Sequence, residues 1–149
     1  MPRIQIQTEP FDIAAEQEVL WRGNPRVGAL VTFVGLMRDL HEGVAVSRMT
    51  LEHYPGMTEK ALAKIAEEAN ARWKLEGMTI VHRVGKLEPQ DPIVFVGVAS
   101  HHRGDAFRAC EFLIDSLKTR APFWKKEQTE QGERWVESRE SDDAAARRW

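Results

Sequence analysis

Two apolar runs constrain the fold more than any other feature of this sequence. Residues 28–35 and 94–99 are apolar on both faces and rich in β-branched side chains, a composition typical of strands buried inside a sheet. Residues 78–87 predict a further strand, which a turn with two prolines separates from a strand at 93–100. We therefore expect a sheet with residues 94–99 at its centre.

Two other segments have the periodicity of amphipathic helices. Residues 57–73 and 105–120 place apolar side chains three or four positions apart, which puts them on one face of a helix. Pro122 ends the second helix, because the residue before a proline is pushed out of the helical region. A further helix is expected at 11–21. The apolar stripes consist of Leu62, Ile65, Ala66, Ala69 and Trp73 in the first helix, and of Phe107, Cys110, Leu113, Ile114 and Leu117 in the second.

The remaining segments predict short strands. Residues 4–6 and 46–54 alternate between polar and apolar side chains, and residues 123–136 predict a hairpin that turns at 130–133. A short charged helix is expected after the hairpin. This order of elements fits an α+β domain with mostly antiparallel pairing. A chain of 149 residues, 42% of them hydrophobic, has the size of one domain, so we expect a single domain over 1–149.

Composition excludes several classes of protein. The net charge is −2 and the charged residues are interspersed with apolar ones, which argues against disorder and against a polybasic membrane anchor. No apolar segment approaches the ~20 residues that span a bilayer, and the first residues lack the pattern of a signal peptide. We expect a cytoplasmic protein with no membrane association. The single cysteine, Cys110, excludes an intrachain disulfide and a cysteine cluster for zinc.

The first candidate site is the junction between a strand and a helix at residues 101–105. The free N–H groups at a helix start, the helix dipole and Arg103 together favour binding of a phosphate or carboxylate. Alternatively, Asp105 caps the helix and Arg103 is a solvated surface charge. Neighbouring side chains of a strand face opposite ways, so His101 and His102 are not expected to share a metal ion. We expect neither a metal nor a cofactor.

The second candidate is the stretch 118–127, which gathers four cations and two large aromatic residues around a helix end. Cations such as Lys118 stabilise a helix C-terminus in any case, and Lys118 is also spaced to pair with Asp115. Stacking on nucleic acid is a further alternative, which a pI near 6.2 weakens. Cys110 lies on an apolar helix stripe, so we expect a packed small side chain rather than a nucleophile.

Several long blocks, taken together, resemble one known family. The stretches 51–57, 94–103 and 117–126 are similar to the signature stretches of the large subunit of molybdopterin synthase, the MoaE family. The similarity continues through further blocks in the family's order and takes in nearly the whole chain. These further blocks are 28–38, 82–85 and the region 135–137.

The resemblance implies a fold, a reaction and partners. The fold is an α/β-hammerhead with an additional small antiparallel sheet, and two copies form a homodimer at the centre of a heterotetramer. A small ubiquitin-like sulfur-carrier subunit docks at each end and threads its C-terminal glycine thiocarboxylate into a pocket of the large subunit. The substrate is cyclic pyranopterin monophosphate (precursor Z), a pterin that receives two sulfur atoms to become molybdopterin.

The resemblance also assigns site residues. Lys118 and Lys125 match the two lysines of the reaction centre. We expect Lys118 to act as a general acid or base or to contact the tail covalently for a short time. We expect Lys125 to position the reactants and to transfer protons. Arg139 matches an arginine that the other protomer contributes. The positions expected to line the pterin and its phosphate are Met37, Arg38, His102, Arg103, Lys126 and Glu127.

These residue types suit the implied chemistry. A thiocarboxylate, a phosphate and a developing oxyanion bring several negative charges into one cleft, which a cluster of Lys and Arg stabilises. Lysines crowded by other cations also titrate closer to neutral pH. Because Cys110 is expected to be packed, persulfide chemistry on this chain is not expected, and sulfur should arrive on a partner.

One position departs from the family pattern. The family often has Gly-Lys-x-Arg where this chain has Gly35, Leu36, Met37 and Arg38, so one cation is missing and a raised substrate KM is expected. Two other functions stay open: a non-catalytic scaffold that binds the small subunit, and a nucleic-acid-binding module. The scaffold reading predicts loss of Lys118 or Lys125, and both are present. The nucleic-acid reading predicts salt-dependent binding.

Overall fold

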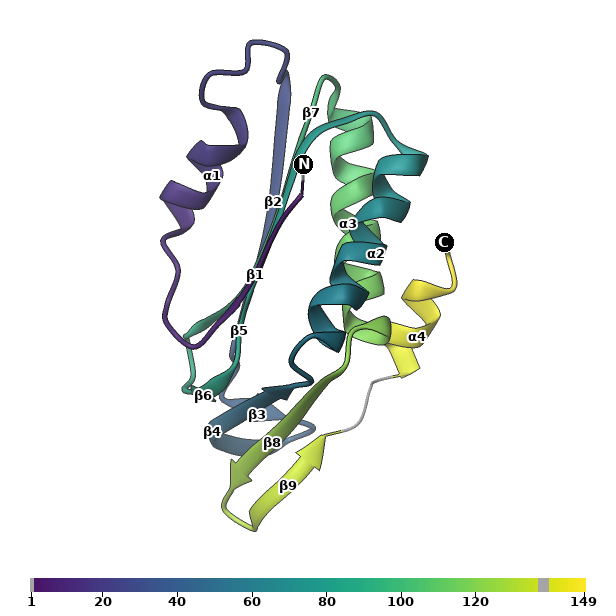
Figure 1. Cartoon of the computed structure of the whole chain (residues 1–149). Helices are drawn as coiled ribbons and strands as arrows, with labels where there is room; N and C mark the ends of the chain where they lie inside the picture. Colours follow the sequence, from purple (N-terminus) through teal and green to yellow (C-terminus); the bar gives the residue numbers. More distant parts are fainter. Residues whose placement is uncertain (1, 137–139) are drawn as a thin grey trace.

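The larger of two sheets forms the framework of the molecule (Figure 1). A computed structural model describes residues 2–136 and 140–149. The order of the four strands is β1-β5-β7-β2, with β1 parallel to β5 and the other neighbours antiparallel. Their bounds are β1 (Arg3–Gln7), β2 (Ala29–Leu36), β5 (Leu75–Arg83) and β7 (Pro92–Ser100). The two runs that are apolar on both faces, in β2 and β7, pair with each other, and β7 is central as expected.

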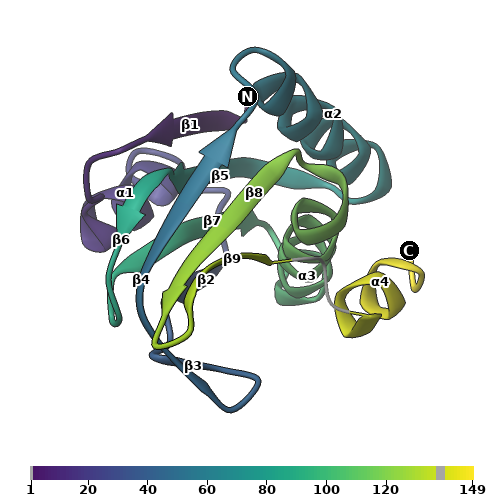
Figure 2. The same cartoon turned by 90° about the horizontal axis from the view of Figure 1, so that it is seen from below.

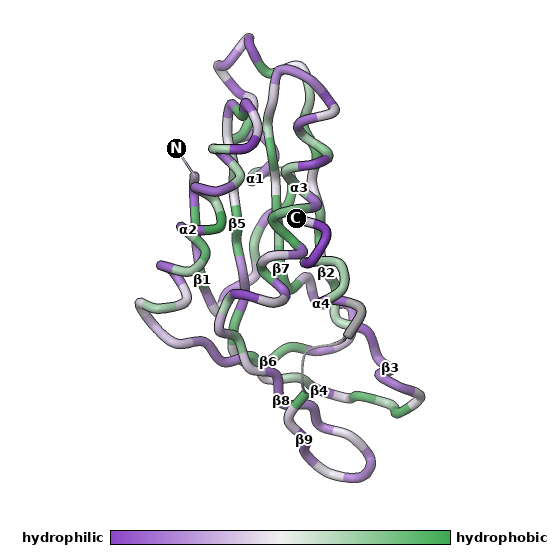
Figure 3. Tube along the Cα trace, turned by 90° about the vertical axis from the view of Figure 1, so that its right-hand side faces the viewer, coloured by the Kyte–Doolittle hydropathy of each residue, from purple (hydrophilic) through white to green (hydrophobic). Residues whose placement is uncertain are grey.

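Helices cover both faces of this sheet. The long helices α2 (Met57–Arg72) and α3 (Arg103–Arg120) lie on one face, and α1 (Ile13–Trp21) lies on the other (Figure 1). Each face has its own buried cluster, one built on α2 and α3 and the other on Leu20 of α1 with Phe95 of β7. Figure 3 shows hydrophobic residues along β5 and β7 and hydrophilic ones at the loop beside β9.

A second sheet packs at one end of the first (Figures 1 and 2). It has five strands but fewer strand residues than the first, and is called the smaller sheet. Its strand order is β3-β4-β8-β9, and β6 also pairs with β4. The bounds are β3 (Leu40–His41), β4 (Val44–His53), β6 (Gly85–Leu87), β8 (Phe123–Thr129) and β9 (Gly132–Val136). A final helix, α4 (Glu140–Ala146), lies against α3. The predicted hairpin and the short final helix are both present.

The structure departs from the sequence predictions at three places. The two-residue strand β3 was not predicted, and the single strand expected at 78–87 is broken at Val84, after which β6 joins the other sheet. In β4, a register shift after Val46 breaks the expected alternation, so that Val46 and Met49 are both buried. None of the described helices is long and apolar enough to cross a membrane.

Candidate active site

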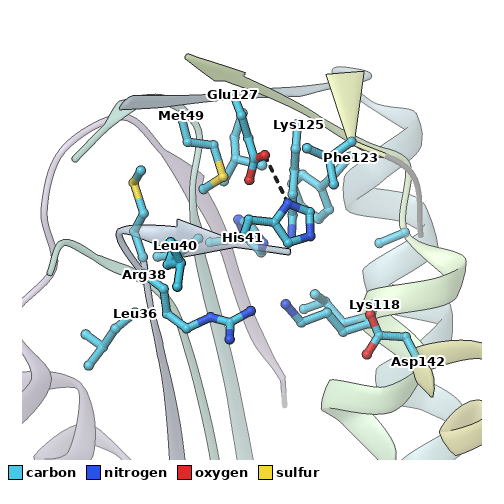
Figure 4. Close-up of a pocket in the computed structure, with 17 residues that line it drawn as sticks. Leu36, Arg38, Leu40, His41, Met49, Lys118, Phe123, Lys125, Glu127 and Asp142 are labelled. Carbon is cyan, nitrogen blue, oxygen red and sulfur yellow. Dashed lines mark hydrogen bonds and ion pairs between the residues drawn. The ribbon is translucent and has the colours of Figure 1, made fainter. Parts of the chain in front are cut away.

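A cavity of about 260 Å³ lies where the two sheets meet the C-terminal end of α3 (Figure 4). Its walls come from the segment after β2, from β4 and β8 of the smaller sheet, from the end of β5, and from the last turns of α3. Residues far apart in the sequence, from Leu36 to Asp142, therefore line one chamber. This volume is slightly below the range of roughly 300–1,000 Å³ typical of pockets for drug-sized molecules, so it suits a small ligand.

Three cations line the cavity. Arg38 follows β2, Lys118 lies in the last turn of α3, and Lys125 lies in β8. Figure 4 shows the guanidinium of Arg38 and the ammonium of Lys118 directed toward each other across the cavity. Three elements thus bring together three positive charges that are separated in the sequence, which is an arrangement suited to a polyanionic ligand.

The alternation of β8 explains which of its side chains line the cavity. Successive side chains of a strand point to opposite faces, and Phe123, Lys125 and Glu127 line the cavity. Lys126 belongs to the other face, where its Nζ lies 3.5 Å from Glu133 Oε2 and 5.2 Å from the centre of the Trp135 ring. The two adjacent lysines therefore have different surroundings.

The negative charge of Glu127 is compensated inside the protein. Its Oε1 lies 3.0 Å from Nδ1 of His41 and accepts a hydrogen bond of 3.1 Å from Nε of Arg134. A second nitrogen of Arg134 donates to the backbone carbonyl of His41 at 3.3 Å. Because Glu127 is bound in this way, it does not cancel the positive charge of the cavity.

The cavity also contains a histidine whose place in the site is not apparent from the sequence. His82, near the end of β5, lines the cavity although only 5% of its surface is exposed. Burial, followed by the positive charges of Lys118 and Lys125, lowers the pKa of His82 to about 4. Its signal in the sequence is a polar residue that ends an otherwise apolar run in β5.

Several expected site residues lie outside the cavity of their own chain. His102 and Arg103 are at the N-terminal end of α3, and fifteen residues of helix separate Arg103 from Lys118, which is roughly 22 Å at the rise of an α-helix. Lys126 faces away, as described above. Arg139 lies outside the described residues. Met37, Arg38, Lys118, Lys125 and Glu127 do line the cavity.

The junction before α3 contradicts the expectation that Asp105 caps the helix, whereas the binding of an anion there stays a prediction. The helix begins at Arg103 with His102 as its N-cap, and no side chain caps it, so Asp105 lies within the first turn. The rings of His101 and His102 lie 4.5 Å apart, edge to face. The chain bends here instead of continuing the strand, so the expectation that the two rings face opposite ways is wrong.

Two other charged residues of α3 are bound within the chain, and Asp115 has a partner other than the expected Lys118. Asp115 accepts hydrogen bonds from Arg148 at 2.9 Å and from Nε1 of Trp149 at 2.8 Å, which ties the end of the chain to α3. Asp115 therefore binds the C-terminal segment instead of Lys118. Arg120 forms an ion pair with Glu68 of α2, so this cation at the helix end has a structural role.

Comparison with known proteins supports one family. A family model described as "MoaE protein" matches residues 6–120, which is more than half of the chain. The chain belongs to the MoaE family. The expected fold class, an α+β protein with the α/β-hammerhead and an additional small antiparallel sheet, is confirmed by the solved MoaE structures that it matches.

The relatives match this chain over almost its whole length. A molybdopterin synthase catalytic subunit of Pseudomonas aeruginosa is 59% identical over 146 residues, covering 98% of this chain and 97% of the relative. The structure of a molybdopterin biosynthesis MoaE protein from Burkholderia ambifaria is 58% identical with a TM-score of 0.86, covering 100% and 98% of the two chains. A molybdopterin synthase structure from Staphylococcus aureus is 38% identical with a TM-score of 0.83, covering 89% and 96%.

Proposed function

We propose that this chain is the catalytic subunit of molybdopterin synthase. In this reaction, cyclic pyranopterin monophosphate receives two sulfur atoms, each delivered as the C-terminal thiocarboxylate of a small sulfur-carrier subunit. Near-full-length relatives that carry this name support the proposal. The single observation that carries it is the cavity in which Arg38, Lys118 and Lys125 converge.

The charges of the cavity fit the charges of the reactants. A thiocarboxylate tail and a phosphate are both anions, and the three cations stabilise them together with the oxyanion that forms when the tail is attacked. Glu127 is paired with the charged Arg134 and lies within hydrogen-bond distance of His41. Each transfer replaces the sulfur of the tail by an oxygen that water supplies, so the tail leaves as a carboxylate and no redox step on this chain is required.

Lys118 and Lys125 are the residues to which we assign the chemistry. Both line the cavity, and the positive charge of each contributes to the lowered pKa of the buried His82. Lys118, on the rigid end of α3, is suited to acid–base work or transient contact with the tail. Lys125, on β8, is suited to positioning and proton transfer.

A homodimer would bring the distant residues of a second copy close to the cavity. His102 and Arg103 lie a helix length away from Lys118 in the same chain, so they reach a shared substrate only if a second copy supplies them. We propose that the N-terminal end of α3 of one protomer approaches the cavity of its partner. Arg139 belongs to the same proposal.

The test is reconstitution with three components. The purified protein is mixed with thiocarboxylated small subunit and cyclic pyranopterin monophosphate, and dithiolene pterin is detected as its oxidised fluorescent derivative. We expect product only when all three are present. Partner binding without product would support a scaffold and contradict the catalytic assignment.

A pair of lysine variants sharpens the test. Lys118→Ala should abolish product while leaving the fold and the binding of the small subunit intact. Lys60→Ala is the matched control, because Lys60 is exposed on α2 and does not line the cavity. Full turnover by Lys118→Ala would remove Lys118 from the mechanism.

A further inference from the structure

His82 is held in one orientation by contacts on two sides. Its Nδ1 lies 2.8 Å from the backbone carbonyl oxygen of Arg83, so this nitrogen carries the proton and donates it. Its ring stacks on Phe123 with 4.0 Å between ring centres and 17° between planes. The ring therefore has a fixed position and a fixed tautomer, as expected of a side chain that must present one atom accurately.

The other ring nitrogen, Nε2, is accessible from the cavity. A neutral imidazole with its proton on Nδ1 has an acceptor lone pair on Nε2, and within the described part of the chain no hydrogen bond is formed by this atom. The described residues also contain no fully buried side-chain nitrogen that lacks a partner. Nε2 must then be accessible, and His82 lines the cavity. The lowered pKa of His82 keeps the ring uncharged near neutral pH.

His82 offers a kind of contact that the charged groups around it do not. Arg38, Lys118 and Lys125 are hydrogen-bond donors only. The carboxylates of Glu127 and Asp142 also line the cavity, but a carboxylate repels an anionic phosphate or thiocarboxylate. A neutral acceptor can bind an N–H or O–H group of a ligand without repelling the ligand's negative charge.

We propose that Nε2 of His82 accepts a hydrogen bond from an N–H or O–H group of the pterin and so fixes the substrate's orientation beside Lys118 and Lys125. This inference rests on the proposed function and assigns a substrate-binding role to a residue outside the cation cluster. The cations hold the anionic parts of the substrate, and His82 distinguishes a pterin with a correctly placed donor from other phosphates.

Two variants test the contact by kinetics. His82→Phe keeps a ring that can stack on Phe123 but removes the acceptor, so the KM for cyclic pyranopterin monophosphate should rise about 10-fold, as for one lost hydrogen bond to a buried donor. The kcat and the affinity for the small subunit should change little. His82→Gln, which restores an acceptor, should recover part of the KM. An unchanged KM, or a fall in kcat alone, would overturn the proposal.

A measurement on the wild-type chain covers the case in which a variant fails to fold. The ¹⁵N resonances of the His82 ring should show an unprotonated Nε2 in the free protein and a shift of that resonance on addition of cyclic pyranopterin monophosphate without the small subunit. A protonated Nε2, or no shift at saturating pterin, would contradict the inference. A shift without product in the three-component assay would instead contradict the proposed function and leave the contact standing.

Discussion

Nδ1 of His41 lies 3.0 Å from Oε1 of Glu127, and this contact joins the short strand β3 to β8, two strands away in the same sheet. The same Glu127 oxygen accepts a hydrogen bond from Arg134 of β9. One carboxylate therefore links β3, β8 and β9 at the wall of the cavity. Glu127 was expected to line the substrate pocket, and its contacts favour a role in holding that wall.

The link between His41 and Glu127 should be measurable as a coupling energy. Both side chains are largely buried, so solvent screens the pair less than it would a surface pair. In a double-mutant cycle with His41→Asn and Glu127→Gln, we expect a coupling of about 1 kcal/mol in the free energy of urea unfolding. Additive effects would show that the two residues act independently.

The adjacent lysines of β8 should respond differently to substitution. Lys125→Ala removes a cation from the cavity and should lower kcat/KM by at least about 100-fold, as for other groups that stabilise transition-state charge. Lys126→Ala removes a cation that faces Glu133 and Trp135, and its effect on kcat/KM should be at least about tenfold smaller. Equal losses in the steady-state assay would mean that Lys126 reaches substrate in the assembled enzyme.

Leu36→Lys should lower the substrate KM. Leu36 lines the cavity and is 56% exposed, so a lysine here would extend along the rim toward an anionic ligand without burial of its charge. We expect a decrease in KM of about fivefold, equivalent to about 1 kcal/mol. Val19→Lys, on the exposed face of α1, adds the same charge away from the cavity and should leave KM unchanged. An unchanged KM in Leu36→Lys would show that this position does not contact substrate.

Cys110 should be inert in the folded protein. Its Sγ lies 3.8 Å from the carbonyl oxygen of Val96 in the buried core, and burial, with a smaller contribution from Glu111, raises the pKa of the thiol to about 12. Because the thiolate is the reactive form, Ellman's reagent should label Cys110 only after unfolding in guanidinium. Cys110→Ala should retain sulfur transfer. Rapid labelling of the native protein, or loss of activity in Cys110→Ala, would contradict both expectations.

Stability should fall in mildly acidic solution because of His82. Its pKa is about 4 in the folded protein against an ordinary value of 6.5, so the unfolded chain binds the proton more readily between these values. The contribution of neutral His82 to the free energy of unfolding is therefore complete above pH 6.5. It is lost as the pH falls toward 4, by up to roughly 3 kcal/mol. Urea unfolding at pH 7.5 and pH 5 should show a smaller decrease for His82→Gln than for the wild type. Equal decreases would mean that other groups cause the acid sensitivity.

Local pattern predicted the helices and strands well, because each long element has its own periodicity. The apolar run of β7 is where the sequence predicts it. Cys110, Leu113 and Leu117 of the predicted α3 stripe are buried, but Phe107 is 61% exposed. The strand β3 is a two-residue arm of a tight hairpin with β4 that turns at Glu42 and Gly43, and it is too short to show an alternation. The bulge in β4 depends on pairing with β8, which is distant in the sequence, so no local pattern predicts it.

The candidate site was predictable in part. Arg38, Lys118 and Lys125 were singled out through resemblance to the family, and the structure brings them to one cavity. His41 and His82 were not singled out, because a lone histidine in a strand has no characteristic spacing. Their roles depend on contacts with Glu127, Phe123 and the lysines, which only the folded chain creates.

The pairing of β4 with β8 has a consequence for the order of folding. Residues 46–53 of the first strand pair with 123–129 of the second, so the cavity closes only through contacts between distant parts of the chain, which form late. During synthesis, the strands of the larger sheet are complete before β8 emerges from the ribosome. A nascent chain therefore has its framework before it has the cavity, and one that stops before Phe123 lacks Lys125, to which we assign a part in the chemistry.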